Sequence, residues 1–127
     1  MGLDEDGIKA DVQAAIDEAG ITGKVCIVGY CFGGVVSWLG ACHCDCLSAA
    51  STFYGGGIHA KREDAPKIPV ILNFGDKDGG IPLSQVHEIK ESHPDIPCYV
   101  YDDSGHGFCC DERESYNQGA CERGHAR

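Results

Sequence analysis

The chain has 127 residues, nine of them cysteine, and its formal net charge at pH 7 is −10. That length predicts one domain with a single core, and the hydrophobic share of 43% is typical of a globular protein. The acidic balance argues against nucleic acid and anionic membranes as partners, because phosphate contacts need clustered Lys and Arg, and no stretch is long enough to span a bilayer.

The hydrophobic pattern predicts helices and strands that alternate along the chain. Apolar residues at helical spacing favour an amphipathic helix over residues 8–19. Short apolar runs then predict strands over residues 24–28, 49–54, 68–74 and 97–101, with helices over 33–41, 83–92 and from 115 onward. This alternation predicts the α/β class, with about four parallel strands and helices on both faces of the sheet.

A glycine-rich segment with a cysteine at its centre directly follows the first predicted strand. Residues 29–34 read GYCFGG, which has the form of a strand-to-helix turn with a nucleophile at its apex. Side chains at Gly29 and Gly33 are expected to collide where the strand and helix backbones approach each other. Cys31 is expected at a helix N-terminus, which favours a thiolate. The alternative is a glycine-rich turn with an inert, buried cysteine.

Two further chemically competent residues follow later predicted strands. Asp78 comes after the third strand and His106 after the fourth. Ligands of parallel sheets bind beyond the carboxyl ends of the strands, so Cys31, Asp78 and His106 are expected to share one site. Their order of nucleophile, acid and base is that of α/β-hydrolases, with His106 as base and Asp78 orienting its imidazole. Asp76 is a rival for the acid role, with loop capping as its alternative.

These segments carry a resemblance to a known family. The sequence GYCFGG, the later runs FYGGG and GDKDGGIP, and GHGF around His106 resemble dienelactone hydrolases, from about residue 24 to about residue 116. The resemblance implies a minimal α/β-hydrolase core, a single domain over residues 1–127 that is truncated at the N-terminus relative to the family. No cofactor and no metal are expected.

The resemblance also implies a reaction. Family members open small lactones or esters through an acyl-thioenzyme, which implies Cys31, His106 and Asp78 as the triad and the backbone N–H of Phe32 as an oxyanion donor. The part of the family fold that precedes the turn supplies a second donor, and little of it is present here, so weak activity is expected. The family also has an arginine shortly after the catalytic histidine, where this chain reads FCC.

The short N-terminal part has a further consequence for the sheet. The strand from Val25 to Val28 is expected to lie at an exposed apolar edge, which is a template for pairing with another chain. Homo-oligomerisation through this edge is therefore predicted.

The cysteines are odd in number and irregularly spaced, and the acidic N-terminus lacks a signal-peptide pattern. Mostly reduced thiols and a cytoplasmic location are therefore expected. The segment from Cys42 to Cys46 (CHCDC) has soft-metal ligand types without paired C-x-x-C spacing, so a helix C-terminal turn is the favoured interpretation. Cys26 is interpreted as a core residue and His125 as solvated, and no role is assigned to Cys109 and Cys110.

The sequence leaves two alternatives to an ester or lactone hydrolase. The first is a half-domain that acts as a binding or assembly module. The second is a cysteine-rich protein that binds thiols or metals.

Overall fold

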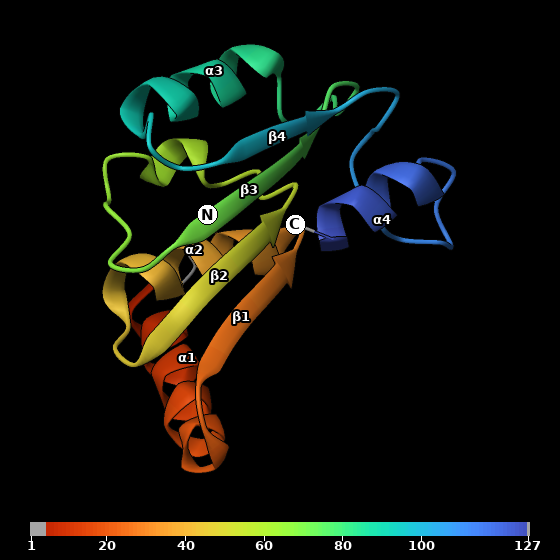
Figure 1. Cartoon of the computed structure of the whole chain (residues 1–127). Helices are drawn as coiled ribbons and strands as arrows, with labels where there is room; N and C mark the ends of the chain where they lie inside the picture. Colours follow the sequence, from red (N-terminus) through yellow and green to blue (C-terminus); the bar gives the residue numbers. More distant parts are fainter. Residues whose placement is uncertain (1–4, 127) are drawn as a thin grey trace.

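The computed structural model describes residues 5–126, so residues 1–4 and 127, which include most of the acidic N-terminus considered above, lie outside the described residues. Helices and strands alternate as predicted (Figure 1). In chain order the elements are α1 (Glu5–Ala19), η1 (Gly20–Thr22), β1 (Val25–Tyr30), α2 (Phe32–His43), β2 (Leu47–Phe53), η2 (His59–Lys61), β3 (Val70–Gly75), α3 (Leu83–Ser92), β4 (Cys98–Tyr101) and α4 (Gln118–Ala126).

The strands form one parallel sheet in the order β1-β2-β3-β4. Each strand therefore pairs with its neighbour in the sequence, and β1 forms an edge of the sheet. Ile27 is paired with Ala50, and Leu72 with Cys98, which aligns the carboxyl ends of all the strands along one rim. This rim is the place where a parallel sheet binds its ligands.

Helices cover both faces, as the sequence predicts. The helices α1 and α2 lie behind the sheet in Figure 1, and α4 lies in front of it near the strands' carboxyl ends. The α2 residue Trp38 is fully buried and stacks edge-on against His93 at the end of α3, so α2 and α3 share a face. On the opposite face, Gly124 of α4 lies so close to the Phe53 ring that a Cβ atom there would come within 2.6 Å.

The last helix begins later than the pattern predicts, at Gln118 and not near residue 115. It begins there because the side chain of Asn117 caps its N-terminus. The side-chain oxygen of Asn117 accepts a hydrogen bond from the backbone N–H of Ala120 at 3.0 Å, which satisfies a donor that the first helical turn leaves unpaired.

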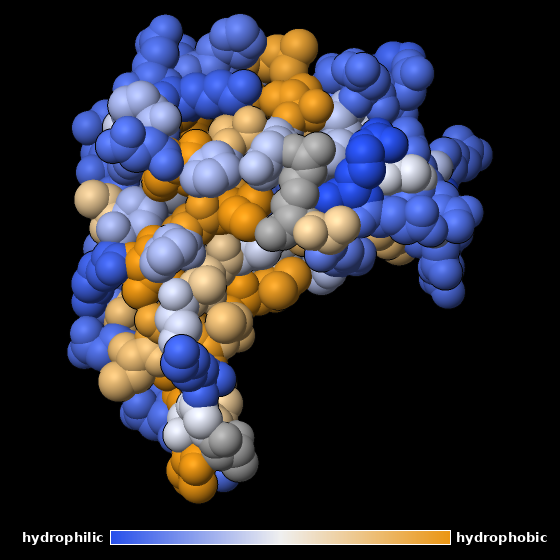
Figure 2. Space-filling view, viewed as in Figure 1, coloured by the Kyte–Doolittle hydropathy of each residue, from blue (hydrophilic) through white to orange (hydrophobic). Residues whose placement is uncertain are grey.

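The core lies mainly between the sheet and α2 and α3, and the opposite face of the sheet is only partly covered. On that face α4 covers the carboxyl ends of the strands, while Cys26 and Val28 of β1 are exposed. The prediction that Cys26 is a core residue is therefore wrong, because its side chain points to the uncovered face. Apolar side chains gather there between α4 and the lower end of the sheet (Figure 2).

None of the helices among residues 5–126 is long and apolar enough to cross a bilayer.

Candidate active site

Cys31 occupies the apex of a strained turn between β1 and α2. Its φ of 54° and ψ of −121° lie in a region that non-glycine residues rarely adopt. A Cβ atom at Gly29 would overlap the carbonyl oxygen of Gly33, so this glycine is required as predicted. Gly33 itself faces open space, and the prediction of a collision there is wrong. The second close approach is at Gly34, where a Cβ atom would come within 3.0 Å of Gly55.

Backbone hydrogen bonds hold this turn against the neighbouring strand. The N–H of Cys31 donates to the carbonyl oxygen of Phe53 at 3.1 Å, and the N–H of Gly34 donates to that of Cys31 at 2.9 Å. Phe32 is the first residue of α2, so its N–H has no acceptor within the helix. The turn therefore presents a thiol and a free backbone donor side by side.

Asp78 and His106 are joined as the sequence predicts. Nδ1 of His106 lies 2.8 Å from Oδ2 of Asp78. The other carboxylate oxygen, Oδ1, accepts a hydrogen bond from the N–H of Gly80 at 2.9 Å. The ring of Tyr54, itself fully buried, packs edge-on against the imidazole with 5.3 Å between ring centroids. These contacts fix the position of His106.

The rival acid, Asp76, has a structural partner instead. Its Oδ1 accepts a hydrogen bond from the backbone N–H of Ser104 at 3.2 Å. The neighbouring Lys77 forms an ion pair with Asp103 at 2.6 Å. Asp76 thus ties the loop after β3 to the loop after β4, which is the capping alternative given above.

Cys31 and His106 line one cleft of about 610 Å³ at the rim of the sheet. Apolar side chains of α1 and α2, including Ile8 and Val35, form much of its wall, and Lys61 also lines it. Among the described residues, no hydrogen bond joins the Cys31 thiol to the imidazole. The structure therefore brings the acid and base together and places the thiol beside them in the same cleft.

The electrostatics of Cys31 differ from the expectation of a resting thiolate. Burial raises the pKa of the Cys31 thiol, and the charges of Cys110 and Asp78 act in the same direction. Arg113 acts against them and lowers that pKa. Arg113 could not be singled out from the sequence, because it lies beyond the FCC segment. The loop folds back so that Arg113 lies against Gly107, next to His106.

The CHCDC segment does not form a shared site. Cys42 belongs to the main core cluster and Cys44 to a smaller one, while Cys46 is exposed. Burial raises the pKa of the Cys42 thiol to about 12. The imidazole of His43 pairs with Asp64 at 2.9 Å. This is the arrangement of a helix C-terminal turn with partly buried thiols.

One pair of cysteines is bonded, although the spacing of the cysteines did not predict a disulfide. Cys109 and Cys121 form a disulfide, and the other seven cysteines are free. Mostly reduced thiols were expected and are found, but Cys109, to which no role was assigned, fastens α4 to the loop that follows His106. Neither residue belongs to a regular cysteine framework, so spacing alone gave no signal.

Comparison with known proteins agrees with this arrangement. The sequence model of the dienelactone hydrolase family matches residues 3–127. A Yersinia pestis protein provisionally named carboxymethylenebutenolidase is 33% identical over 122 residues, which cover 85% of this chain and 46% of that protein. A carboxymethylenebutenolidase of Pseudomonas putida is 26% identical over 114 residues, covering 86% of this chain and 48% of its own length.

Solved structures resemble the fold closely. A provisionally named dienelactone hydrolase from Klebsiella pneumoniae superposes with a TM-score of 0.87 at 26% identity, covering 99% of this chain and 60% of that one. A dienelactone hydrolase-like promiscuous phosphotriesterase from metagenomic libraries gives a TM-score of 0.74 at 21% identity, a likeness of fold alone. The chain spans about half the length of the curated relatives it matches.

Proposed function

The chain belongs to the dienelactone hydrolase family, and from this we propose that it hydrolyses small carboxylic esters or lactones with Cys31 as nucleophile. The observation that carries the proposal is the hydrogen-bonded pair of His106 and Asp78, which lies beside Cys31 at the rim of the sheet. A buried acid that orients an imidazole near a nucleophile is the arrangement that acyl transfer needs.

The reaction follows from the protonation states. Because burial raises the pKa of Cys31, the resting group is a thiol, and His106 takes its proton as Sγ attacks the ester carbonyl. The Phe32 N–H stabilises the oxyanion of the tetrahedral intermediate. His106 then gives the proton to the leaving alkoxide, which departs as an alcohol and leaves a thioester on Cys31. Water, deprotonated by His106, hydrolyses the thioester and restores the thiol. Asp78 stabilises the imidazolium of His106 both when the thioester forms and when it is hydrolysed.

We expect a low turnover. The turn itself supplies one backbone donor, that of Phe32, and loss of a single oxyanion donor reduces turnover by about 10²–10³-fold. The apolar cleft of Ile8 and Val35 accommodates small acyl or alcohol groups without many polar contacts to discriminate among them. The expected enzyme is slow and accepts a range of activated esters.

The proposal includes self-association through the β1 edge. β1 pairs with β2 on one side, and its Val28 side chain is 54% exposed. An apolar strand at a sheet edge pairs readily with another chain. The seven free cysteines support a cytosolic location, since reduced thiols persist in that compartment.

Hydrolysis of p-nitrophenyl acetate tests the catalytic proposal directly. We expect Cys31→Ala and His106→Ala to lose the burst of acyl-enzyme formation and nearly all turnover, because each removes a group that the chemistry requires. Cys31→Ser should retain only a small fraction of the wild-type activity, since a hydroxyl is harder to deprotonate than a thiol. Cys46→Ser, which changes an exposed free cysteine, is the matched control. Equal rates in all of these proteins would refute the hydrolase and favour the assembly module.

A further inference from the structure

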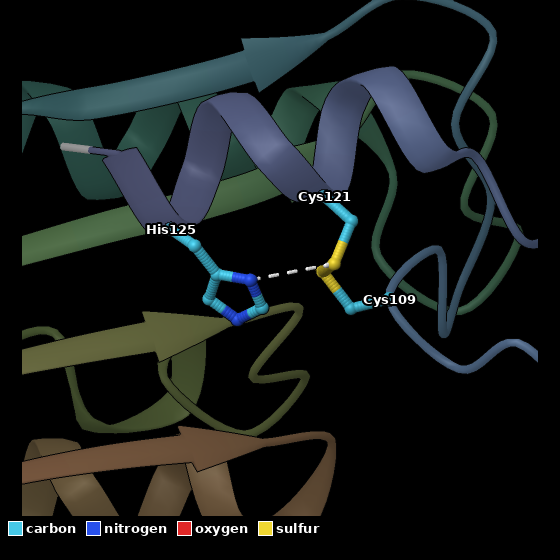
Figure 3. A group of neighbouring side chains, drawn as sticks. All are labelled: Cys109, Cys121 and His125. Carbon is cyan, nitrogen blue, oxygen red and sulfur yellow. Dashed lines mark hydrogen bonds between the residues drawn. A yellow bond between two sulfur atoms is a disulfide. The ribbon is translucent and has the colours of Figure 1, made fainter.

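A second group of reactive side chains joins α4 to the loop that follows His106. Sγ of Cys109, Sγ of Cys121 and Nδ1 of His125 all lie within 4.8 Å of one another. Cys121 and His125 are one turn apart on α4 and both point toward Cys109 (Figure 3). In the structure the two sulfur atoms are bonded as a disulfide.

The geometry points to a Zn²⁺ site made by Cys109, Cys121 and His125 when the disulfide is reduced. Two thiolates and an imidazole are the ligand types that tetrahedral zinc takes. With bonds of about 2.3 Å to sulfur and about 2.0 Å to nitrogen, those two ligand atoms are about 3.6 Å apart on a tetrahedral ion. Sγ of Cys121 and Nδ1 of His125 are 3.6 Å apart. This edge of the site has zinc geometry before any metal is bound.

The imidazole is held in the orientation that ligation requires. Its other nitrogen, Nε2, lies 2.5 Å from the hydroxyl of Tyr30 at the end of β1. When Nε2–H donates to that hydroxyl oxygen, the lone pair of Nδ1 faces the sulfur atoms, which is the support that zinc-bound histidines commonly receive. The Phe53 ring, with its centroid 5.0 Å from that of the imidazole, restricts the ring further.

Burial leaves one side of the group open. Cys121 is buried and Cys109 is half-buried, while His125 is exposed. A metal can enter from the side of His125, and water can occupy the fourth position. A second group of potential metal ligands consists of Glu5, His43 and Asp64. This group is less suited to a metal ion, because Glu5 already forms ion pairs with Lys9 and Lys61.

The two states of the group are related by balanced steps. Two equivalents of a small thiol reduce the disulfide, giving two cysteine thiols and one small-molecule disulfide. Binding of Zn²⁺ then releases the two thiol protons. Exchange with a small-molecule disulfide reverses the change: it accepts the two electrons, leaves as two equivalents of the small thiolate, and the re-formed Cys109–Cys121 disulfide releases the metal. The loop after His106 is fastened to α4 in either state.

The test uses the full chain, reduced with a phosphine under argon, freed of reductant and titrated with Co²⁺ as a spectroscopic probe. We expect one equivalent of Co²⁺ to give the thiolate-to-cobalt charge-transfer band, and Zn²⁺ to remove it. His125→Gln and Cys121→Ser should weaken binding by about 100-fold or more, and Tyr30→Phe by about 10-fold, the scale of an outer-shell change. The oxidised protein should show no band.

Exposed Cys46 provides the matched control, and Cys46→Ser should bind Co²⁺ like the wild type. His125→Gln leaves the disulfide intact, so it serves as the readout if Cys121→Ser fails to fold by circular dichroism. Two results would refute the proposed metal site and leave a purely structural disulfide. One is a reduced wild type that shows no charge-transfer band, and the other is a His125→Gln variant that binds Co²⁺ as tightly as the wild type. This readout does not depend on ester hydrolysis, so it succeeds or fails separately from the proposed enzyme.

Discussion

Asp78 and His106 are 2.8 Å apart but differ in their access to solvent, because the carboxylate side chain is fully buried and the imidazole is 37% exposed. The carboxylate is held by the N–H of Gly80 on one oxygen and by the imidazole on the other. The base is therefore fixed from behind by a rigid acid and remains open toward the cleft that it shares with Cys31. In the proposed mechanism, the imidazole can exchange protons with groups in this cleft while its hydrogen bond to the carboxylate stays in place.

Replacing Asp78 by Asn tests the acid. The amide keeps the shape of the side chain but no longer stabilises the imidazolium or fixes its tautomer, so we expect kcat for p-nitrophenyl acetate to fall by about 10³–10⁴-fold. Asp76→Asn is the matched control, since its remaining oxygen still accepts the hydrogen bond from Ser104. A comparable loss in Asp76→Asn, measured as initial rates, would reassign the acid.

Arg113→Gln tests the charge near the thiol. Arg113 lowers the pKa of Cys31, so its removal should raise that pKa further and shift the rate of Cys31 alkylation to higher pH. The readout is the iodoacetamide modification of the Cys31 peptide by mass spectrometry across pH. Arg123→Gln is the control, because Arg123 lies over the Tyr101 ring. Identical profiles for Arg113→Gln and the wild type would contradict the assignment.

Gly29 and Gly33 should respond oppositely to the same substitution. Gly29→Ala forces a methyl group into the carbonyl of Gly33, and we expect a loss of about 3 kcal/mol in the free energy of unfolding, or no folded protein. Gly33→Ala meets open space within α2, where alanine stabilises a helix by up to about 1 kcal/mol. Urea unfolding of both variants gives the two free energies of unfolding. Equal destabilisation would contradict the prediction that, of these two glycines, only Gly29 has a close backbone contact.

Alkaline pH should destabilise the fold through Cys42. Its folded thiol has a pKa of about 12 against an ordinary value of 9.0, so the unfolded chain releases this proton first. Stability is therefore complete below about pH 9 and falls above it, by at most about 1.4 kcal/mol per pH unit for this thiol. Urea unfolding measures this effect in two variants. Between neutral pH and about pH 10, the free energy of unfolding should fall less in Cys42→Ala than in Cys46→Ala. Equal slopes would remove Cys42 as the cause.

Self-association through β1 is tested with Val28→Lys. A lysine on an exposed edge strand opposes pairing with a second chain, so the variant should elute as a monomer while the wild type does not. Leu83→Lys changes another exposed apolar residue, on α3, and should leave the oligomer intact. Light scattering after size exclusion gives both masses. A monomeric wild type at micromolar concentration would contradict the proposal.

Local patterns were sufficient for most of the fold. The helix α3 has the predicted bounds, Leu83–Ser92, because its apolar spacing is regular and Pro94 follows it. The shared location of Cys31, Asp78 and His106 could be predicted because each lies in the segment that follows a strand, and the strand ends meet at one rim. Their catalytic roles remain a prediction. The start of α4 could not be placed, since it depends on the side chain of Asn117 and not on hydrophobic periodicity.

Features that depend on contacts between distant segments were missed. The disulfide between Cys109 and Cys121 needs α4 to be seated on the sheet, and nothing in the cysteine spacing specifies that position. Arg113 reaches the site only because its loop turns back against Gly107. The motif predicts a close backbone approach at Gly33, whereas in the structure that approach falls one residue later, at Gly34.

The order of the strands also sets the order in which the site is completed during synthesis. Since each strand pairs with its sequence neighbour, the sheet can grow strand by strand as the chain emerges from the ribosome. The turn at Cys31 is anchored only when β2 supplies the Phe53 carbonyl, and His106 arrives only after β4 has joined. A nascent chain therefore carries the Cys31 thiol before the His106 imidazole is in place, and the proposed ester chemistry requires the finished sheet.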